Sequence, residues 1–512
     1  MSDQSKALPL SRTVAVIGSG AMGAGIAQVA AAAGYTVQLF DTRAEAVTQA
    51  IAGIAAMFDK LAAKGRMTAD QARQASARLH PASSLAALAE AALVVEAIVE
   101  NLDVKRKVFA ELEGLVADDC IFASNTSSIS ITSIGAGLRL PQRLVGMHFF
   151  NPVPLMALVE VISGLASDAA VAACVYDTAL VWGKNPVHTK STPGFIVNRV
   201  ARPYYAEALR LLNEQAADPA TIDAILRESG GFRMGPFELM DLIGHDVNFA
   251  VTQSVFQAYF TDPRFTPSLI QQELVNAGFL GRKSARGFYH YGDNVAAPLA
   301  LTETPAVLAP QVVQLFGAGP LVSALSARLE HLSLERHMAP GADQLLLQCG
   351  NARLYLTDGR SATQRASDNA HADTILIDLA LDYSLATRVA LTPADQCSSA
   401  AYAQILALLQ AAGYAVSRLD DVPGMAVMRT VAMLANEAAD TVNQGVCSAA
   451  DADMAMQKGV NYPRGPLAWA DAIGLPVIAD VLAHLAAAYG EDRYRVSPLI
   501  LRKTASGVPF HV

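Results

Sequence analysis

Two ionisable residues interrupt apolar stretches of the chain and could together form a proton acceptor. His148 stands between Met147 and two phenylalanines, and Glu160 stands between two valines. A buried carboxylate is costly unless it is paired and hydrogen-bonded, and a histidine–glutamate pair would satisfy both groups. The carboxylate would also fix the tautomer of the imidazole and make its other nitrogen a better general base. Taken singly, a core histidine and a local ion pair are plainer explanations, and no HxxxH or HExxH spacing suggests a metal.

A glycine-rich loop near the start of the chain could bind a dinucleotide. Gly18, Gly20 and Gly23 fit the spacing GxGxxG, Met22 lies inside the loop, and Asp41 follows further along the chain. The first glycine permits a tight turn, the second lets the backbone approach a pyrophosphate, and the third lets the next helix pack closely. Because a β-branched strand precedes the loop and an alanine-rich helix follows it, the pattern favours a dinucleotide site over a plain glycine turn.

Asp41 also bears on which dinucleotide would bind. Its carboxylate would accept hydrogen bonds from the adenosine ribose and would repel the additional phosphate of NADP. The sequence therefore favours NAD as the cofactor. Arg43 lies close to Asp41 in the sequence, so NADP stays open as an alternative.

The elements that must position these residues alternate between strands and helices. A second strand is expected at 35–40, and residues 44–80 have a helical pattern. Alternating elements of this kind form a doubly wound sheet of the Rossmann type, which binds ligands at the carboxyl ends of its strands. Further strands are expected within 92–101, 121–131, 143–152 and 155–162.

Composition excludes several classes of protein. The 512 residues are 52% hydrophobic with a formal net charge of −9, which argues against disorder and against nucleic acid held by net charge. Five scattered cysteines without a CxxC pair fit a reducing compartment. The apolar stretch 13–40 is interrupted by five glycines, and the N-terminal dozen residues have no hydrophobic core. We therefore expect a cytoplasmic protein with no membrane partner and no nucleic-acid partner.

Four longer motifs stand in a fixed order along the first part of the chain. They are SNTSS (124–128), HFFNPVPLMALVEV (148–161), STPGFIVNR (191–199) and GRKSARGFYHY (281–291). In sequence and order they closely resemble the L-3-hydroxyacyl-CoA dehydrogenases, over about residues 13–290. The resemblance implies an N-terminal Rossmann-type domain followed by an all-α domain that contacts substrate and a second subunit. It also implies NAD-dependent oxidation of an L-3-hydroxyacyl-CoA to a 3-oxoacyl-CoA.

The resemblance assigns roles to particular residues. The catalytic histidine of the family falls on His148 and its partner carboxylate on Glu160, in agreement with the pair inferred above. The serine that binds the substrate hydroxyl falls on Ser127. The active-site asparagine falls on Asn198, in the first helix after the sheet.

Further positions in the resemblance concern the cofactor and coenzyme A. Contacts to the nicotinamide half of NAD fall on Glu100, Lys105 and Asn125. The lysine near the 3′-phosphate of coenzyme A falls on Lys64, although Lys60 competes because the helical hairpin differs in length.

A long internal repeat occupies the second half of the chain. Residues 192–244 match residues 422–474 without a gap, at a constant offset of 230. Such a match indicates a duplicated helical module. Asn198 corresponds to Met428, which cannot orient a hydroxyl by hydrogen bonding. We therefore expect a second copy that lost its site and packs against the first, as two subunits do in single-copy relatives.

These observations predict three domains and a degenerate connector. Residues 304–320 are interrupted by proline and glycine and are interpreted as a linker with short helices, followed by an α/β unit without GxGxxG. The predicted parts are an NAD-binding Rossmann domain (10–190), a first helical domain contributing Asn198 (191–291), a connector with a degenerate Rossmann-like unit (292–418) and a second, non-catalytic helical domain (419–512).

The function expected is that of an NAD-dependent 3-hydroxyacyl-CoA dehydrogenase, with an acyl-CoA as substrate and a possible homo-oligomer. Long chains of this kind resemble members of the family that act on 3-hydroxyadipyl-CoA in phenylacetate breakdown, whereas shorter relatives act on 3-hydroxybutyryl-CoA. A distal carboxylate would need a cation, for which Arg202 and Arg233 are candidates. Two alternatives from other classes are a non-catalytic NAD- or acyl-CoA-binding protein and a dehydrogenase of free hydroxy acids.

Overall fold

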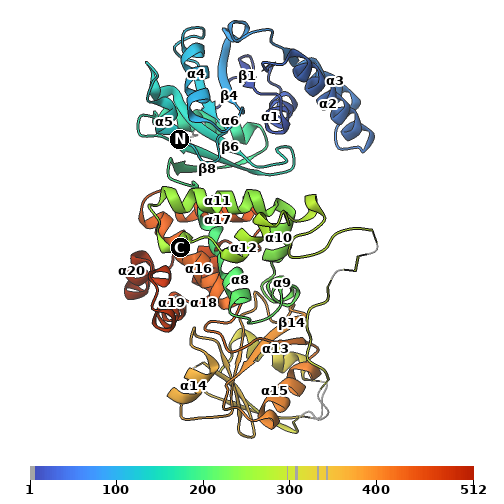
Figure 1. Cartoon of the computed structure of the whole chain (residues 1–512), viewed down its shortest axis with the longest axis vertical. Helices are drawn as coiled ribbons and strands as arrows, with labels where there is room; N and C mark the ends of the chain where they lie inside the picture. Colours follow the sequence, from blue (N-terminus) through green and yellow to red (C-terminus); the bar gives the residue numbers. More distant parts are fainter. Residues whose placement is uncertain are drawn as a thin grey trace. The chain divides into compact units, whose positions relative to one another are not determined.

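The computed structural model divides into two compact units. It describes residues 6–293, 295–296, 298–305, 310–330, 334–341 and 344–511. The first unit comprises Met1–Arg199 and Gln444–Val460, and the second comprises Val200–Asn443 and Asn461–Val512. A short segment from late in the sequence therefore belongs to the N-terminal unit (Figure 1).

The first unit is built on a parallel sheet with one antiparallel pair. Its strands are β1 (Thr13–Ile17), β2 (Val37–Phe40), β3 (Leu79–Pro81), β4 (Ala91–Glu96), β5 (Ile121–Ser124), β6 (Leu144–Phe149), β7 (Leu158–Ser163) and β8 (Asn185–Lys190). They lie in the order β3-β2-β1-β4-β5-β6-β7-β8, and β6 and β7 are the antiparallel neighbours. The order from β3 to β6 is that of a dinucleotide-binding sheet. The predicted Rossmann-type fold is confirmed.

Helices cover this sheet, so its strands are almost continuously apolar. All six residues of β4 and of β6 are buried, as expected for strands covered on both faces. The loop after β1 leads directly into a helix whose N-cap is Gly20. The helices of the sheet are α1 (Ala21–Ala32), α4 (Leu102–Glu113), α5 (Ile131–Gly135), α6 (Ala169–Val181) and α7 (Val197–Val200).

The predicted helical stretch after β2 is a hairpin of two helices, α2 (Ala44–Ala63) and α3 (Ala69–Ala77) (Figure 1). Thr68 and Gln71 form a capping box that starts α3. Among the described helices, α2 is the one straight helix long and apolar enough to pass a length-and-composition test for a membrane span. One such helix is weak support for a span, and 17% of its most apolar stretch is buried.

The second unit contains most of both helical copies. The first copy has α8 (Arg202–Asn213), α9 (Pro219–Glu228), α10 (Pro236–Ile243), α11 (His245–Ala258) and α12 (Leu269–Asn276). The second copy has α16 (Val427–Asn443), α18 (Pro466–Ile473), α19 (Leu475–Tyr489) and α20 (Pro498–Ser506), while its α17 (Ala449–Gly459) belongs to the first unit. The expected packing of the two copies is present, because α8 and α16 lie against each other.

The connector forms a second sheet, which is more regular than the sequence suggested. Its strands are β9 (Val312–Phe316), β10 (Glu335–Ala339), β11 (Leu345–Cys349), β12 (Ala352–Leu356), β13 (Thr374–Ile377), β14 (Arg388–Pro393) and β15 (Ala415–Arg418), with helices α13 (Pro320–Arg328), α14 (Ala362–Asp368) and α15 (Ser399–Ala411). They lie in the order β10-β9-β11-β12-β13-β14-β15. The interpretation of 304–320 as a linker is wrong at 312–316, where alternating burial of Val313 and Leu315 makes a strand; residues 306–309 lie outside the described part.

The structure extends the repeat well beyond the helical module. At the offset of 230, β7 coincides with β14, α6 with α15 and α10 with α18, each at both ends. The strand pairings agree as well, because β13 and β14 are antiparallel and β14 and β15 are parallel, like β6 to β8. The duplicated segment therefore includes the second half of the nucleotide domain, with no nucleotide loop ahead of it.

The two copies exchange a helix between their sheets. In the first unit, α17 of the second copy packs against β7 and β8. In the second unit, α9 of the first copy packs against β14, where the Ser229 hydroxyl donates to the carbonyl of Arg388 at 2.6 Å. Each sheet is thus covered in part by a helix from the other copy.

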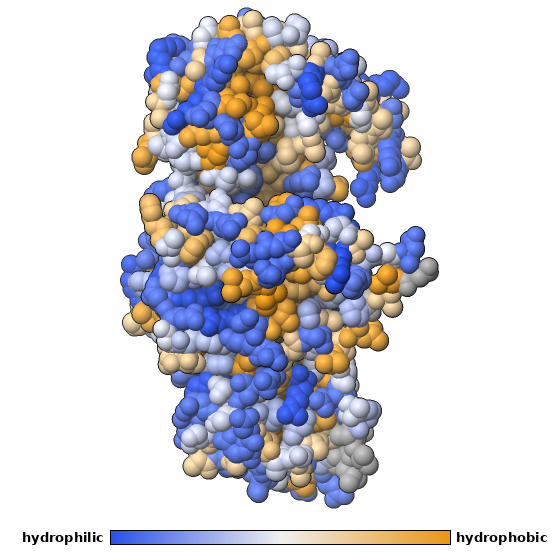
Figure 2. All heavy atoms as spheres, viewed as in Figure 1, coloured by the Kyte–Doolittle hydropathy of each residue, from blue (hydrophilic) through white to orange (hydrophobic). Residues whose placement is uncertain are grey.

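Burial in α16 accounts for much of the apolar composition. Every residue from Val427 to Thr441 is buried, whereas the visible face of the helical part carries many hydrophilic residues (Figure 2). Arg429 is fully buried in this helix and donates from Nε to Glu207 of α8 at 2.7 Å and from Nη2 to the Tyr494 hydroxyl at 2.7 Å. Burial raises the pKa of Glu207, but Arg429 and Arg493 outweigh it and lower that pKa below its ordinary value.

Replacing Arg429 by methionine should strongly destabilise the second unit. The change leaves a buried Glu207 carboxylate without its main counter-charge, which typically costs about 3–5 kcal/mol. Urea unfolding of the full chain measures the loss, with the exposed Arg233→Met as control. Since protonation relieves an unpaired carboxylate, the deficit should shrink as the pH falls from 7 to 5. A deficit that is absent, or that grows on acidification, would contradict the role of the pair.

Candidate active site

His148 and Glu160 lie opposite each other on β6 and β7. The strand register pairs the two residues directly, and His148 Nδ1 is 2.7 Å from Glu160 Oε2. Glu160 is fully buried, and His148 is 6% exposed. A carboxylate oxygen can only accept, so Nδ1 carries the proton and Nε2 is left as the acceptor. The aromatic rings of Phe150 and Phe195 flank the imidazole, at 4.5 and 5.9 Å between centroids.

The second oxygen of the same carboxylate holds the turn that leads into α7. Glu160 Oε1 accepts from the backbone N–H groups of Ile196 and Val197 at 2.9 and 3.0 Å. These amides open α7, where Asn198 is half-buried. Phe195 adopts a φ of 46° in this turn, a conformation that few residues other than glycine hold without support. Glu160 therefore connects the histidine to the helix that carries Asn198.

The turn after β5 is organised around the Glu100 carboxylate. Glu100 Oε1 accepts from the Thr126 hydroxyl at 2.7 Å and from the backbone N–H of Ser127 at 3.0 Å. The Ser127 hydroxyl lies 3.4 Å from the same oxygen and is exposed. Although burial raises the pKa of Glu100, the hydrogen bond from Thr126 and the charge of Lys105 lower it below its ordinary value. The exposed serine is thus set on a turn fixed by a charged carboxylate.

A buried ion pair between Lys105 and Glu96 holds this turn in place. It was not predicted from the sequence. Lys105 is 1% exposed and donates from Nζ to Glu96 Oε1 at 2.7 Å, with Glu100 at 3.3 Å. The other oxygen of Glu96 accepts from the Ser124 hydroxyl at 2.6 Å. Glu96 ends the apolar strand β4, so a charge inside an apolar run, the signal that revealed Glu160, could have found it.

Asn125, the remaining residue predicted beside the nicotinamide, links the end of β5 to β6. Asn125 follows β5, and its Oδ1 accepts from the backbone N–H of Phe149 at 2.8 Å, next to His148. Lys184, also missed, donates from Nζ to the carbonyls of Val153 and Met156, which lie in the loop after β6. Burial lowers the pKa of Lys184 to about 8. Both contacts fix the segments that flank the histidine.

The glycine loop fits a dinucleotide at each position. Gly18 has a φ of 100°, and a Cβ there would collide with the carbonyl oxygen of Ala97. A Cβ at Gly23 would collide with the carbonyl oxygen of Gly18, so the helix packs as closely as predicted. A Cβ at Gly20 would meet nothing within 4 Å, which leaves room for a pyrophosphate at the start of α1, close to Met22.

Asp41 lies at the end of β2 and contacts the same loop. Its Oδ2 accepts from the backbone N–H and the hydroxyl of Ser19 at 2.9 and 2.8 Å. Partial burial raises the pKa of Asp41, but the hydrogen bonds from Ser19 and Arg43 outweigh it and lower that pKa. The side chain of Arg43 is 77% exposed, 3.8 Å from Asp41. A charged carboxylate at this place matches the predicted ribose contact.

Within the described part of the chain, no hydrogen bond or ion pair links either candidate lysine for coenzyme A to the other predicted site residues. Lys60 and Lys64 are both exposed at the C-terminal end of α2, and Lys64 is its C-cap. The structure therefore does not choose between them. No group of three or more histidine, cysteine, aspartate or glutamate residues that could hold a metal occurs among the described residues.

Comparison with known proteins identifies the family. Residues 13–192 match the NAD-binding domain of 3-hydroxyacyl-CoA dehydrogenases, and residues 194–291 and 424–508 each match their C-terminal domain. Over 96% of this chain and 97% of the relative, the sequence is 44% identical to a protein of Escherichia coli K12 named 3-hydroxyadipyl-CoA dehydrogenase. The chain belongs to the 3-hydroxyacyl-CoA dehydrogenase family. It is accordingly an NAD-dependent oxidoreductase of 3-hydroxyacyl-CoA thioesters.

Solved structures of relatives have the same architecture. A crystal structure titled 3-hydroxybutyryl-CoA dehydrogenase from Escherichia coli superposes with a TM-score of 0.89 at 43% identity, covering 98% of this chain and all of that one. A shorter (S)-3-hydroxybutyryl-CoA dehydrogenase from Ralstonia eutropha covers 55% of this chain at 40% identity and a TM-score of 0.54. Residues 354–423 also match a reduced Rossmann-fold domain described for 3-hydroxybutyryl-CoA dehydrogenase, where the sequence predicted a degenerate one.

The second copy of the dehydrogenase keeps a carboxylate at the equivalent turn but lacks the residues proposed for catalysis. At the offset of 230, His148 becomes Asp378, Glu160 becomes Ala390 and Asn198 becomes Met428. Asp378 accepts from the N–H groups of Ala426, Val427 and Met428 at 2.7–3.0 Å. In both copies a carboxylate therefore caps the same turn. It comes from β7 in the first copy and from the residue after β13 in the second.

In the first unit, α17 of the second copy supports the strand and helix of the active copy. Its Gly459 packs so closely that an added Cβ would lie 2.6 Å from the Leu158 side chain and 3.1 Å from that of Val197. Just before α17, the carbonyl of Val446 accepts from the N–H of Lys190 at 2.9 Å. Leu158 lies two residues before Glu160, and Val197 lies directly before Asn198.

Replacing Gly459 by valine should reduce turnover through this contact. The added methyl groups would displace Leu158 and Val197 and disturb the hydrogen bonds of Glu160, and an overpacked site typically costs about 1–3 kcal/mol. Turnover should fall by about tenfold with little change in NAD affinity. Gly53→Val is the matched control, since a Cβ at Gly53 in α2 meets nothing within 4 Å. Equal turnover in the two variants would contradict a supporting role for α17.

Proposed function

We propose that this dehydrogenase oxidises 3-hydroxyadipyl-CoA in the breakdown of phenylacetate. The proposal rests on near-full-length similarity to the Escherichia coli protein of that name and on the four residues proposed for catalysis, His148, Glu160, Ser127 and Asn198, in the first copy. The runner-up substrate is 3-hydroxybutyryl-CoA, because the similar full-length crystal structure carries that name. The proposed site of action is the cytoplasm, with an acyl-CoA as partner and a homo-oligomer as the proposed assembly.

The observation that carries the proposal is the buried contact of His148 Nδ1 with Glu160 Oε2, at 2.7 Å. With Nδ1 as the donor in this contact, Nε2 of the neutral imidazole would act as the base. The imidazolium formed after proton transfer would be stabilised by the Glu160 carboxylate. Positioned general-base catalysis of this kind typically contributes about 10²–10⁴-fold.

The other residues have orienting roles in this proposal. Ser127 and Asn198 would donate to or accept from the substrate hydroxyl, so that its proton points to His148 Nε2. NAD, when bound, supplies the acceptor for the hydride that leaves the same carbon. Glu100, Lys105 and Asn125 would form the wall beside the nicotinamide, and Gly18, Gly20, Gly23 and Asp41 would hold the adenosine half. Lys64 is the proposed contact of the coenzyme A phosphate.

The proposed division of the chain follows from the same roles. Residues 10–190 would bind NAD, 191–291 would contribute Asn198, and 292–418 would connect the copies. Residues 419–512 would form the second helical domain, without a site of its own.

Glu160→Gln should slow the chemical step by about 10²–10⁴-fold. The amide oxygen can still accept from Ile196 and Val197, whereas the amide nitrogen cannot accept from His148, so the change removes the pair and keeps the turn. Single-turnover formation of NADH measures the step, and Glu111→Gln, an exposed glutamate of α4, is the control. Unchanged single-turnover rates in Glu160→Gln would refute the pair as the base.

The substrate proposal is tested by kcat/KM for NAD reduction at matched concentrations. We expect 3-hydroxyadipyl-CoA to exceed 3-hydroxybutyryl-CoA, and free 3-hydroxyadipate to react far more slowly than its thioester. A tenfold preference for the four-carbon substrate, about 1.4 kcal/mol in the transition state, would replace the proposed substrate by the runner-up. Equal rates for the free acid would point to a dehydrogenase of free hydroxy acids.

A further inference from the structure

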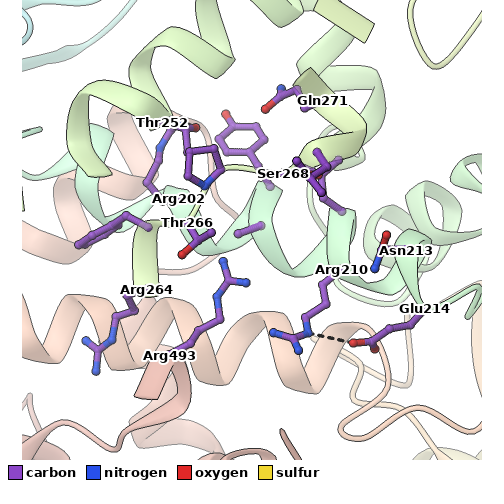
Figure 3. A pocket seen from close by; sticks show the side chains of 16 residues that line it. Arg202, Arg210, Asn213, Glu214, Thr252, Arg264, Thr266, Ser268, Gln271 and Arg493 are labelled. Atoms are coloured by element: carbon purple, nitrogen blue, oxygen red, sulfur yellow. Dashed lines mark hydrogen bonds and ion pairs between the residues drawn. The ribbon is translucent and has the colours of Figure 1, made fainter. Parts of the chain in front are cut away.

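A cavity of about 230 Å³ in the second unit has an unusual concentration of arginines. Arg202 and Arg210 come from α8, Arg264 from the 3-10 turn η3 (Pro263–Phe265), and Arg493 from the 3-10 turn η5 (Asp492–Tyr494) (Figure 3). Three of the four belong to the first helical copy and the fourth to the second. Both copies of the helical module therefore line the cavity.

Two of these arginines are already neutralised. Arg210 makes ion pairs with Glu214 at 2.9 Å and with Glu491 at 2.6 Å. Arg264 pairs with Asp440 and with Glu437, and its guanidinium group points away from the middle of the cavity in Figure 3. Neither arginine needs a ligand to balance its charge.

Arg202 is buried without such a partner. It is 5% exposed, and its hydrogen bond within the described residues goes from Nη1 to the neutral Thr252 hydroxyl at 3.1 Å. Its Nε has no hydrogen-bond acceptor, and its guanidinium carbon lies 4.8 Å from the centre of the Tyr205 ring. Burial lowers the pKa of Arg202, opposed by Tyr205 and Tyr462 and by no carboxylate. A buried cation of this kind is rare unless something pairs with it.

Arg493 is the second incompletely paired cation. It is 8% exposed, and its nearest carboxylate oxygen, Glu207 Oε1, is 3.8 Å from Nε. Glu207 is already engaged through its other oxygen by Arg429 and the Tyr494 hydroxyl. The guanidinium group of Arg493 points toward Thr266 on the cavity wall in Figure 3.

The repeat shows that the fold itself does not require Arg202. At the offset of 230, Arg202 corresponds to Ala432 in α16, the equivalent helix of the second copy. The turn η5 follows η3 at an offset of 229, so Arg493 corresponds to Arg264, and both copies have an arginine there. The buried charge of Arg202 is therefore particular to the first copy.

The rest of the wall suits an organic anion. Ser268 is the N-cap of α12 and makes no side-chain capping bond, so the positive end of that helix opens at the cavity. Leu209 and Phe265 supply apolar surface beside the arginines. Guanidinium groups bind carboxylates through two parallel hydrogen bonds, and the apolar wall would accept a short carbon chain, which an inorganic phosphate lacks.

We propose that this cavity binds a small aliphatic carboxylate through Arg202 and Arg493. The site is separate in its residues from the pair at His148 and does not rest on the proposed substrate. It would draw on both copies of the helical module, with Arg202 from the first and Arg493 from the second.

The test is calorimetric titration of the full chain with adipate, and with inorganic phosphate as the competing oxyanion. We expect saturable binding of one adipate per chain, weakened at least tenfold in Arg202→Gln and in Arg493→Gln. The control is Arg502→Gln, because Arg502 is exposed and lies outside the cavity, and it should bind like the parent. If adipate bound at the catalytic site instead, Arg202→Gln would leave its affinity unchanged, and that result would overturn the proposal. Phosphate that binds as tightly as adipate would also overturn it.

Thermal unfolding gives a second readout that does not depend on detecting heat. Arg202→Gln removes a buried, unpaired charge, so it should fold and should melt no lower than the parent without ligand. Adipate should raise the melting temperature of the parent and of Arg502→Gln but not of Arg202→Gln. A lower melting temperature in unliganded Arg202→Gln would show that the arginine is already satisfied in the fold and would overturn the proposal.

Discussion

The active site depends on one buried carboxylate that cannot be left unpaired. Glu160 satisfies one oxygen with His148 and the other with the amides of Ile196 and Val197. Desolvation makes each of these contacts expensive to lose. His148 on the sheet and the turn that leads to Asn198 on α7 are therefore both held by one carboxylate.

The second copy separates the structural part of this constraint from the chemical part. Its turn still receives a carboxylate, but from Asp378, directly after the strand that corresponds to β6, while Ala390 stands where Glu160 would be. Burial raises the pKa of Asp378 to about 6, against the hydrogen bonds from Met428 and its neighbours. Both copies thus cap the turn with a carboxylate, whereas only the first copy places a histidine against it.

The chemistry could be predicted from the sequence because charge inside an apolar strand is a local signal. His148 and Glu160 were found in this way, and the glycine loop by its spacing. Contacts that join distant segments, such as Lys184 with the loop after β6, have no such signal. The choice between Lys60 and Lys64 also stayed open, because both are exposed on a helix end where the described residues provide no interaction to distinguish them.

The extent of the repeat was underestimated for a related reason. In the helical module, glycines and aspartates at turns kept their identity, so 192–244 and 422–474 match on inspection. In the sheet, a buried strand requires apolar side chains of suitable volume and little else, and β14 matches β7 in position without matching it in sequence. The strand at 312–316 was missed because proline and glycine on both sides made it resemble a linker.

The exchange of helices explains how a copy can lose its chemistry and still be kept. β7 carries Glu160, and its neighbour Leu158 is covered by Gly459 of the second copy. Reciprocally, β14 is covered by α9 of the first copy, which ties Ser229 to Arg388. Removing either helical module would uncover an apolar strand in the other half, at a cost that scales with the exposed area. The second copy therefore has a structural role that does not depend on the residues of a second site, because its α17 packs against the strand that carries Glu160.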